Sequence, residues 1–426
     1  MVYEIRKQDV FSINIEIHFS NAYHCFMENR HLSGSDPDYR KKSVLWLASW
    51  YPNEAEPFSG DFIQRQAKAV SACQPITVIY VGKSAPGSNK QKEPDVKSMT
   101  GNLQEKIFYY SIHGFLSKWK SLVTYFKKHH GFIIELRSKN DLPDLVHVHV
   151  AMKAGLVALY LKWRYKIPYL LTEHWSGYYP QAMDSLYRKS VAERYLTKLI
   201  LKNASMVLPV SHALGKQISH YWIRVPFHEI PNVVDTRYFY PPENTKVHPF
   251  RFIHISTLLY PKNPEAIVRT FMELLRSGFD AELILVGPLN PSINALLVEI
   301  ADAGEKIRAT GEISYEEVGS ELRKSSALVL FSSYENMPCV ILEALCTGIP
   351  VVATRVGGIS EVVREDNGIL VSAGNENELL EAMKEMMRNN QAFDMNKIAR
   401  RSAALFSYET IGKKIIDIYD SVLKKN

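Results

Sequence analysis

The sequence has few cysteines and no long apolar run, and each shortage excludes a class of protein. Its four cysteines, Cys25, Cys73, Cys339 and Cys346, form no CxxC pair. A disulfide-stapled secreted fold and a zinc finger are therefore not expected, and a reducing compartment fits best. No apolar run reaches the roughly 20 residues that span a bilayer, and charges interrupt the amino-terminal segment as they would not in a signal peptide. These absences predict a cytoplasmic protein.

Charge of one sign is also scarce. Lysine and arginine number 51 against 45 acidic residues, which leaves a net charge of +6. This excess is too small for a nucleic-acid-binding protein, so no nucleic-acid partner is expected, although an anionic substrate or membrane surface is compatible with it. The sequence has no short repeat, which excludes solenoids and propellers. It also has no GxGxxG turn after a strand, which argues against a bound NAD.

Short apolar runs alternate with amphipathic stretches from Ser43 onward, and this pattern predicts βαβ units with parallel sheets. A Pro-rich stretch from Pro226 to Pro249 separates two such series. In the first series, strands are predicted at 43–49, 76–81, 107–110, 145–150, 168–172 and 206–210, with helices such as 61–73, 153–165 and 186–202. In the second series, strands are predicted at 251–256, 281–286, 307–310, 327–331, 350–354 and 368–371. The predicted fold class is α/β, with two Rossmann-like doubly wound halves that face each other.

The same pattern predicts the domain boundaries. The first half covers residues 43–225 and the second covers 226–408, while a final amphipathic helix at 409–426 is expected to return to the first half. Residues 1–42 form an extension with two open interpretations. In the first, the ordered enzyme begins near Lys42, and the segment is an appendage or results from a start assigned too far upstream; in the second, it is an extra hairpin packed on the edge of the first half.

The sharpest feature is the segment from Phe331 to Pro350, in which a strand ends in a polar loop and a helix follows. Asn336 is predicted as the N-cap with Pro338 in the first helical turn, and Gly348 ends the helix. Glu335 then precedes the helix start, a natural anion site, and Glu343 lies beyond it. Two carboxylates around an anion site match a sugar diphosphonucleoside, with its sugar hydroxyls, diphosphate and ribose. Taken alone, the two glutamates would more often be solvated surface residues.

A second glycine-rich turn follows the next predicted strand, where backbone can approach a phosphate closely. With it, segment 327–371 resembles the donor-binding region of GT-B glycosyltransferases of family 4, retaining enzymes with a Glu-x7-Glu motif. The resemblance implies that Glu335 contacts the transferred sugar and Glu343 the ribose. It also implies donor contacts from Asn336, Met337, Gly357 and Gly358. Asn336 departs from the glycine that many members carry.

Two further positions of the second half extend the resemblance. It implies that Lys262 neutralises the donor diphosphate as the sugar bond breaks, and that Gly287 lines the nucleotide. Many relatives pair this lysine with an arginine, but Thr257 stands at that position. Three interpretations are open: Lys262 acts alone, a cation such as Arg355 or Arg65 substitutes, or the chain is a weakened or inactive homologue.

The first half adds a glycine loop and a group of histidines. Gly60 lies at a predicted helix start, and the resemblance implies that its loop closes over the diphosphate. His147 and His149 share one side of a predicted strand, and His174 ends the neighbouring one, so a polar cluster is expected between the halves. Metal binding is possible there without being required. The resemblance implies His149 as the active-site histidine, His174 nearby, and no metal or cofactor besides the UDP- or GDP-sugar substrate.

The acceptor is the least determined part of the prediction. In residues 118–139, six lysines and arginines are interleaved with Trp119, Tyr125 and Phe126. This basic helix either contacts an anionic membrane or is an ordinary solvated face. The predicted function is retaining transfer of a hexosyl unit to a glycan or lipid-linked acceptor in cell-surface polysaccharide biosynthesis. Two alternatives are a GT-B sugar-nucleotide epimerase or phosphorolytic enzyme, and a non-catalytic GT-B partner subunit.

Overall fold

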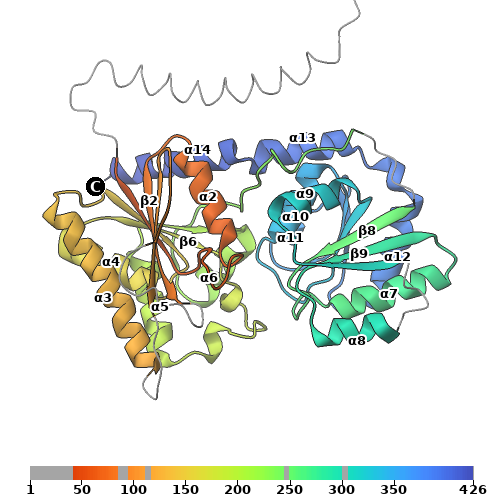
Figure 1. Cartoon of the computed structure of the whole chain (residues 1–426), viewed down its shortest axis with the longest axis horizontal. Helices are drawn as coiled ribbons and strands as arrows, with labels where there is room; N and C mark the ends of the chain where they lie inside the picture. The colour runs from red at the N-terminus through yellow and green to blue at the C-terminus, as the bar shows by residue number, and fades with distance from the viewer. Residues whose placement is uncertain (1–41, 85–94, 111–116, 244–248, 300–305, 426) are drawn as a thin grey trace, which may run out of the picture.

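The structure is a computed structural model that describes residues 42–84, 95–110, 117–243, 249–299 and 306–425. Residues 1–41 of the predicted extension lie outside the described residues, and so do the side chains of Lys118 and Trp119. Two α/β halves lie side by side, and the last two helices run along both of them (Figure 1). The predicted fold class is confirmed.

The first half is built on a seven-stranded sheet in the order β3-β4-β2-β1-β5-β6-β7. Neighbouring strands are parallel except for the β3–β4 pair. The strands are β1 (Val44–Ala48), β2 (Ile76–Lys83), β3 (Asp95–Thr100), β4 (Leu103–Tyr110), β5 (Leu145–His149), β6 (Tyr169–Glu173) and β7 (Met206–Pro209). Its helices are α2 (Asp61–Ser71), α3 (Ser117–Ser138), α4 (Ala154–Tyr165), α5 (Val191–Asn203) and α6 (His212–Tyr221).

The second half is built on a six-stranded parallel sheet in the order β10-β9-β8-β11-β12-β13. The strands are β8 (Phe250–Ile255), β9 (Ala281–Val286), β10 (Ile307–Gly311), β11 (Ala327–Leu330), β12 (Val351–Thr354) and β13 (Gly368–Val371). Its helices are α7 (Pro264–Arg276), α8 (Pro291–Glu299), α9 (Tyr315–Arg323), α10 (Cys339–Thr347), α11 (Ile359–Val362), α12 (Glu376–Arg388) and α13 (Met395–Phe406). The last helix of the chain is α14 (Tyr408–Leu423).

The central strands of both sheets are apolar runs because helices cover them on both faces. Every residue of β1, β5, β6, β11 and β12 is buried, which explains why these strands could be predicted as continuous apolar runs. The edge of the first sheet differs, since buried and half-buried residues alternate along β4. The prediction therefore found only the end of β4, at 107–110, and it missed the antiparallel strand β3.

Two local predictions about helices are wrong, for reasons of capping. The single helix predicted at 186–202 is a short 3-10 turn, Leu186–Arg188, followed by α5. The helix restarts there because Ser190 and Glu193 form a reciprocal capping box. In the second half, Asn336 is not the N-cap of α10. Pro338 takes that position, with no side-chain cap, and Gly348 ends the helix in the left-handed conformation.

The carboxy-terminal helix α14 packs on the first half. Its closest neighbour is α2, and a β-carbon at Gly412 would lie 2.6 Å from the carbonyl oxygen of Ala69. Tyr419 of this helix accepts a hydrogen bond from the indole of Trp46 and shares another with His147. In Figure 1, α13 and α14 cross from the second half to the first along one side of the molecule. The crossing connects the two halves.

Candidate functional site

The loop after β11 places Glu335 against Lys262. Glu335 is 8 % exposed and accepts a hydrogen bond of 2.8 Å from the Ser332 hydroxyl. Its carboxylate also forms an ion pair with the Lys262 ammonium, which comes from the loop between β8 and α7. Asn263 holds that loop in place by donating to the Phe331 carbonyl at 3.0 Å. The two residues that sequence analysis assigned to sugar and diphosphate therefore lie in contact.

Glu343 faces the other half of the molecule. It lies on α10 with a side chain that is only 6 % exposed, and the guanidinium of Arg65 on α2 approaches its carboxylate to 3.7 Å. Burial raises the pKa of Glu343 to about 7, and Arg65 acts in the opposite direction. The same guanidinium donates to Asp61 at 2.5 Å and lies 4.4 Å from the ring centre of Tyr315 on α9.

The predicted glycines lie where backbone segments touch. Gly357 has a positive φ of 51°, and a β-carbon there would lie 1.8 Å from the carbonyl oxygen of Glu335. Gly358 donates its N–H to the carbonyl of Asn336 at 2.8 Å. The turn after β12 thus supports the Glu335 loop directly, and a larger residue at Gly357 would push that loop away.

Two other glycines make equally close backbone contacts. Gly60, the left-handed N-cap of α2, would place a β-carbon 2.5 Å from the carbonyl carbon of Trp50. Gly287 follows β9, and its β-carbon would lie 1.9 Å from the carbonyl oxygen of Ser256. Both glycines are therefore required by the packing of the loops that follow the strands, whatever the loops bind.

The fully buried His149 and the half-buried His174 form a pair in the first half. The Nδ1 atom of His149 lies 3.4 Å from the Nε2 atom of His174, and the rings stack at 18°. Burial lowers the pKa of both imidazoles, that of His174 to about 3, so both are neutral at pH 7. The Nε2 atom of His149 has no hydrogen-bond partner within the described part of the chain, whereas Asn232 acts on His174 through a side-chain hydrogen bond. His149 can therefore accept or donate one further hydrogen bond, depending on its tautomer.

His147 does not belong to a cluster between the halves, in contrast to the prediction. Its two ring nitrogens make hydrogen bonds of 2.7 Å to Tyr419 and Thr172, and the side chain is fully buried in the first half. It is a satisfied core histidine that anchors α14. For the residues that the structure describes, no group of three or more histidine, cysteine or acidic side chains could hold a metal ion.

Sequence analysis missed the role of Glu173, at the end of β6. Its buried carboxylate accepts hydrogen bonds from the N–H groups of Ala151, His174 and Trp175, at 2.9–3.1 Å. The Tyr178 hydroxyl donates a fourth bond at 2.8 Å. Glu173 thereby fixes the loops that follow β5 and β6, and with them His174. The only signal in the sequence was its position between Thr172 and His174.

The loops of the two halves are joined by hydrogen bonds. Asn336 donates its amide to the carbonyl of His174 at 2.6 Å, and Asn232, in the stretch that connects the halves, donates to the carbonyl of Met337 at 2.8 Å. Glu361 of α11 accepts the N–H groups of His212 and Ala213 at the start of α6. Asn336, the departure from the family glycine, thus connects the Glu335 loop to the histidine pair.

Arg355 was the other cation considered as a substitute for the arginine that many relatives carry at the position of Thr257. Arg355 is exposed and is one of the groups that lower the pKa of Glu378. Thr257 itself is exposed. Of the cations considered, Lys262 and Arg65 are the two that pair with the site carboxylates. Among the described residues, no helix is long and apolar enough to cross a membrane.

Comparison with known families gives two matches that together cover most of the chain. Residues 76–238 match the family described as Glycosyltransferase Family 4, and residues 249–389 match Glycosyl transferases group 1. The first match lies in the half that carries the histidine pair, and the second includes Lys262, Glu335 and Glu343.

Individual proteins show the same similarity. A Bacillus subtilis glycosyltransferase assigned to teichuronic acid biosynthesis, TuaC, is 27% identical over 361 residues, which cover 80% of this chain and 88% of that protein. N-acetyl-alpha-D-glucosaminyl L-malate synthase of Bacillus anthracis is 24% identical, covering 68% and 76% of the two chains.

Solved structures have the same fold. Sucrose-phosphate synthase from Thermosynechococcus elongatus superposes with a TM-score of 0.76 at 20% identity, covering 90% of this chain and 100% of that one. HepE of Anabaena in complex with UDP-glucose gives 0.65 at 18% identity, covering 89% and 99%.

Proposed function

Because the chain belongs to the GT-B glycosyltransferases of family 4, we propose that it is a retaining enzyme that transfers a hexosyl unit from a UDP- or GDP-linked sugar. We propose a glycan or lipid-linked acceptor, in the biosynthesis of a cell-surface polysaccharide. The observation that carries the proposal is the pairing of both site carboxylates with cations, Glu335 with Lys262 and Glu343 with Arg65. The relative assigned to teichuronic acid biosynthesis and the neighbour solved with UDP-glucose support the substrate class.

Each pair fits one part of the donor. A nucleotide diphosphate brings negative charge toward Lys262, whose ammonium then leaves Glu335 free to accept hydrogen bonds from the sugar hydroxyls. Glu343 accepts hydrogen bonds from the ribose hydroxyls. The loop supported by Gly357 and Gly358 lies against Glu335, so backbone groups near Asn336 and Met337 line the donor. Gly60 and Gly287 keep the surrounding loops close enough to complete the site.

The transfer itself needs no protein nucleophile. The bond between C1 of the sugar and the β-phosphate oxygen breaks, and the acceptor oxygen bonds to C1 on the same face, which retains the configuration. The proton of the acceptor hydroxyl passes to the departing β-phosphate oxygen, so the products are the glycoside and the nucleoside diphosphate. Lys262 stabilises the charge that grows on the diphosphate, and positioning contributes the rest.

His149 is the proposed contact of the first half with the transferred sugar. Its imidazole is neutral at pH 7 and retains one unbonded nitrogen, so it can hydrogen-bond a hydroxyl without adding charge. His174 holds it from the side, and the Asn336 amide fixes the backbone of His174. The sugar is thus bound between Glu335 of one half and the histidine pair of the other.

The direct test is a screen of thermal unfolding with UDP-, GDP- and ADP-linked sugars. A ligand that binds the folded state raises the unfolding temperature by mass action, so at least one UDP or GDP compound should do so. Radiolabelled donor of that type, incubated with and without a glycan acceptor, then separates transfer from epimerisation and hydrolysis. Binding of none of these nucleotides would refute the proposed donor site. Binding without any transfer would favour a non-catalytic partner.

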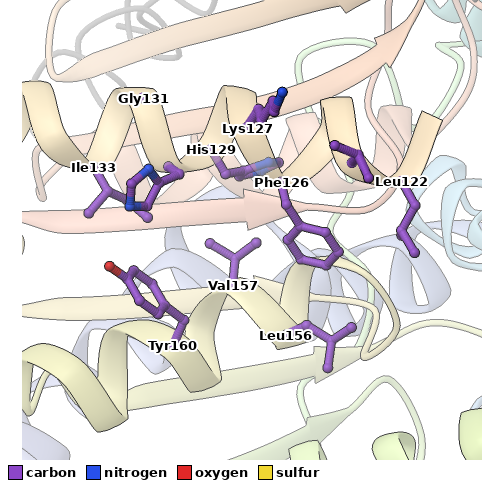
Figure 2. A pocket seen from close by; sticks show the side chains of 11 residues that line it. Leu122, Phe126, Lys127, His129, Gly131, Ile133, Leu156, Val157 and Tyr160 are labelled. Carbon is purple, nitrogen blue, oxygen red and sulfur yellow. The ribbon is translucent and has the colours of Figure 1, made fainter. Parts of the chain in front are cut away.

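For the acceptor side, we propose that α3 and α4 contact an anionic membrane. A groove of about 730 Å³ lies between these helices, lined mainly by apolar side chains. Figure 2 shows Phe126 of α3 pointing toward Leu156 of α4, with Val157 beside it, Leu122 near one end and Tyr160 at the other. Several apolar side chains of this face are more than a third exposed: Leu122, Val123, Ile134, Tyr160 and Trp163.

The exposed lysines and arginines of α3 and α4 favour a membrane with negatively charged head groups. The exposed cations of α3, α4 and the residues that follow them are Lys120, Lys127, Arg137, Lys139, Arg164 and Lys166. Exposed apolar side chains with exposed cations on the same helices match an anionic bilayer, whose hydrocarbon accepts the former and whose head groups attract the latter. A lipid-linked acceptor would reach the enzyme at such a surface.

Sedimentation with vesicles tests this surface. Phosphatidylglycerol vesicles should carry the protein down and phosphatidylcholine vesicles should not, because the second kind lacks net charge. Leu122→Glu should reduce the bound fraction, whereas Leu405→Glu, equally exposed on α13, should not. Equal sedimentation of both variants with the wild type would show that α3 and α4 form an ordinary solvated face.

A further inference from the structure

Arg65 belongs to the first half but pairs with Glu343, a site residue of the second half. It lies on α2 in the first half, yet its side chain is 8 % exposed and reaches α9 and α10 of the second half. Figure 1 shows α2 at the junction, facing the helices of the second half. Within the part of the chain that the structure describes, it is the only lysine or arginine that forms an ion pair with Glu343.

The surroundings of Glu343 explain why such a partner is needed. Apart from Arg65, the charged and titratable groups around this carboxylate are Asp61 of α2, Tyr315 of α9, and Cys339 and Cys346 of α10. None of them is a cation, and burial favours the uncharged acid. Burial holds the pKa of Glu343 at about 7 even with Arg65 and the Tyr315 hydroxyl beside it, so loss of Arg65 would raise this pKa further and leave less of the carboxylate to accept hydrogen bonds.

The guanidinium is itself only partly used. It donates to Asp61 at 2.5 Å, stacks on Tyr315 and stands 3.7 Å from Glu343, which is ion-pair range but longer than a hydrogen bond. Its Nε atom is buried without a hydrogen-bond partner in the described residues. The unpaired Nε donor of Arg65 leaves hydrogen-bonding capacity at the junction, next to the position proposed for the ribose.

We propose that Arg65 is a positioning residue for the nucleotide ribose. It holds Glu343 as a carboxylate from the opposite half, so ribose recognition depends on the closed arrangement of the molecule. This inference rests on the proposed donor site and adds a coupling to it. When the halves separate, Glu343 loses its cation and its affinity for the ribose hydroxyls falls. When they close, the charge pair and the donor contacts form together.

The test compares nucleotide binding of Arg65→Met with the wild type across pH. Isothermal titration with UDP and with GDP, at pH 6, 7 and 9, gives the ratio of variant to wild-type dissociation constants, and the ratio removes the titration of the nucleotide itself. Loss of the cation raises the pKa of Glu343, so more of the acid is protonated below that pKa. The variant should bind about tenfold more weakly at pH 6–7 and within about threefold of the wild type at pH 9.

Two further variants separate this role from a merely structural one. Arg65→Lys keeps the charge and should restore most of the affinity at pH 7. In a Glu343→Gln background, which cannot ionise, Arg65→Met should add little, because the coupling has already been removed. A loss in Arg65→Met that is equal at all three pH values, or the absence of any loss, would overturn the inference. Failure of the wild type to bind either nucleotide would instead refute the donor site itself.

Discussion

The two acid–cation pairs of the site are built differently. Lys262 and Glu335 both come from the second half, on neighbouring loops that Asn263 and Gly357 lock together. Arg65 and Glu343 come from different halves and meet only where these touch. The first pair is therefore complete within one domain, whereas the second depends on how the two domains are placed. The proposed chemistry and the proposed closure therefore depend on separate pairs.

Removing the pair within one half should have the largest effect. We expect Lys262→Ala and Glu335→Ala each to lower kcat by about 100-fold or more, because the diphosphate loses its cation or the sugar its carboxylate as charge develops. Steady-state transfer of radiolabelled sugar measures this. Lys384→Ala removes a half-buried lysine of α12 that pairs with the exposed Glu381, and it should leave kcat unchanged. Near-normal turnover in either site variant would contradict the assignment.

The pair between the halves should affect binding more than turnover. Glu343→Ala is expected to raise the donor KM by about tenfold or more, the effect of losing hydrogen bonds to a charged group, with a small change in kcat. Glu343→Gln keeps the shape and should have a smaller effect than the alanine variant. An unchanged KM in Glu343→Ala would count against the role in ribose binding, and a fall in kcat alone would move this residue to the reacting centre.

The hydrogen bond between the loops of the two halves should have a moderate effect. Asn336→Ala removes the donor to the His174 carbonyl, and we expect the donor KM to rise a fewfold, as for the loss of about one neutral hydrogen bond. Donor titrations at fixed acceptor concentration would show it. Asn375→Ala, which removes the cap of α12 far from this contact, should leave KM as it is. Identical values for both variants would mean that the contact does not help closure.

A substitution outside both acid–cation pairs, Tyr419→Phe, should have the smallest effect on activity. Tyr419→Phe removes the hydroxyl that bonds Trp46 and His147 in the buried interface of α14. Thermal or denaturant unfolding should show a loss of about 1–3 kcal/mol, the cost of unpaired buried polar groups, while nucleotide affinity stays constant. A large loss of nucleotide affinity would instead place His147 in the donor site and contradict its assignment as a core histidine that anchors α14.

Most of the fold could be predicted from the sequence because the central strands are covered on both faces. Runs such as Val44–Ala48 and Leu145–His149 are entirely buried, so apolarity alone reveals them. The strands β3 and β4 lie at the sheet edge, where half-exposed positions carry polar residues, and the pattern weakens there. Helix starts were also missed when they depended on a cap, as at Ser190, or on a proline that itself occupies the N-cap, as at Pro338.

The sequence by itself determined the family and the proximity of Glu335 to the start of α10, since both follow from a strand–loop–helix motif within one stretch of chain. Only the tertiary structure decided that Lys262 pairs with Glu335, that Glu343 pairs with Arg65, and that His147 serves α14 and not the site. The physical reason is distance along the chain. Local spacing places residues on one helix or loop, but the partner of a buried charge is chosen by the packing of elements that lie far apart in the sequence.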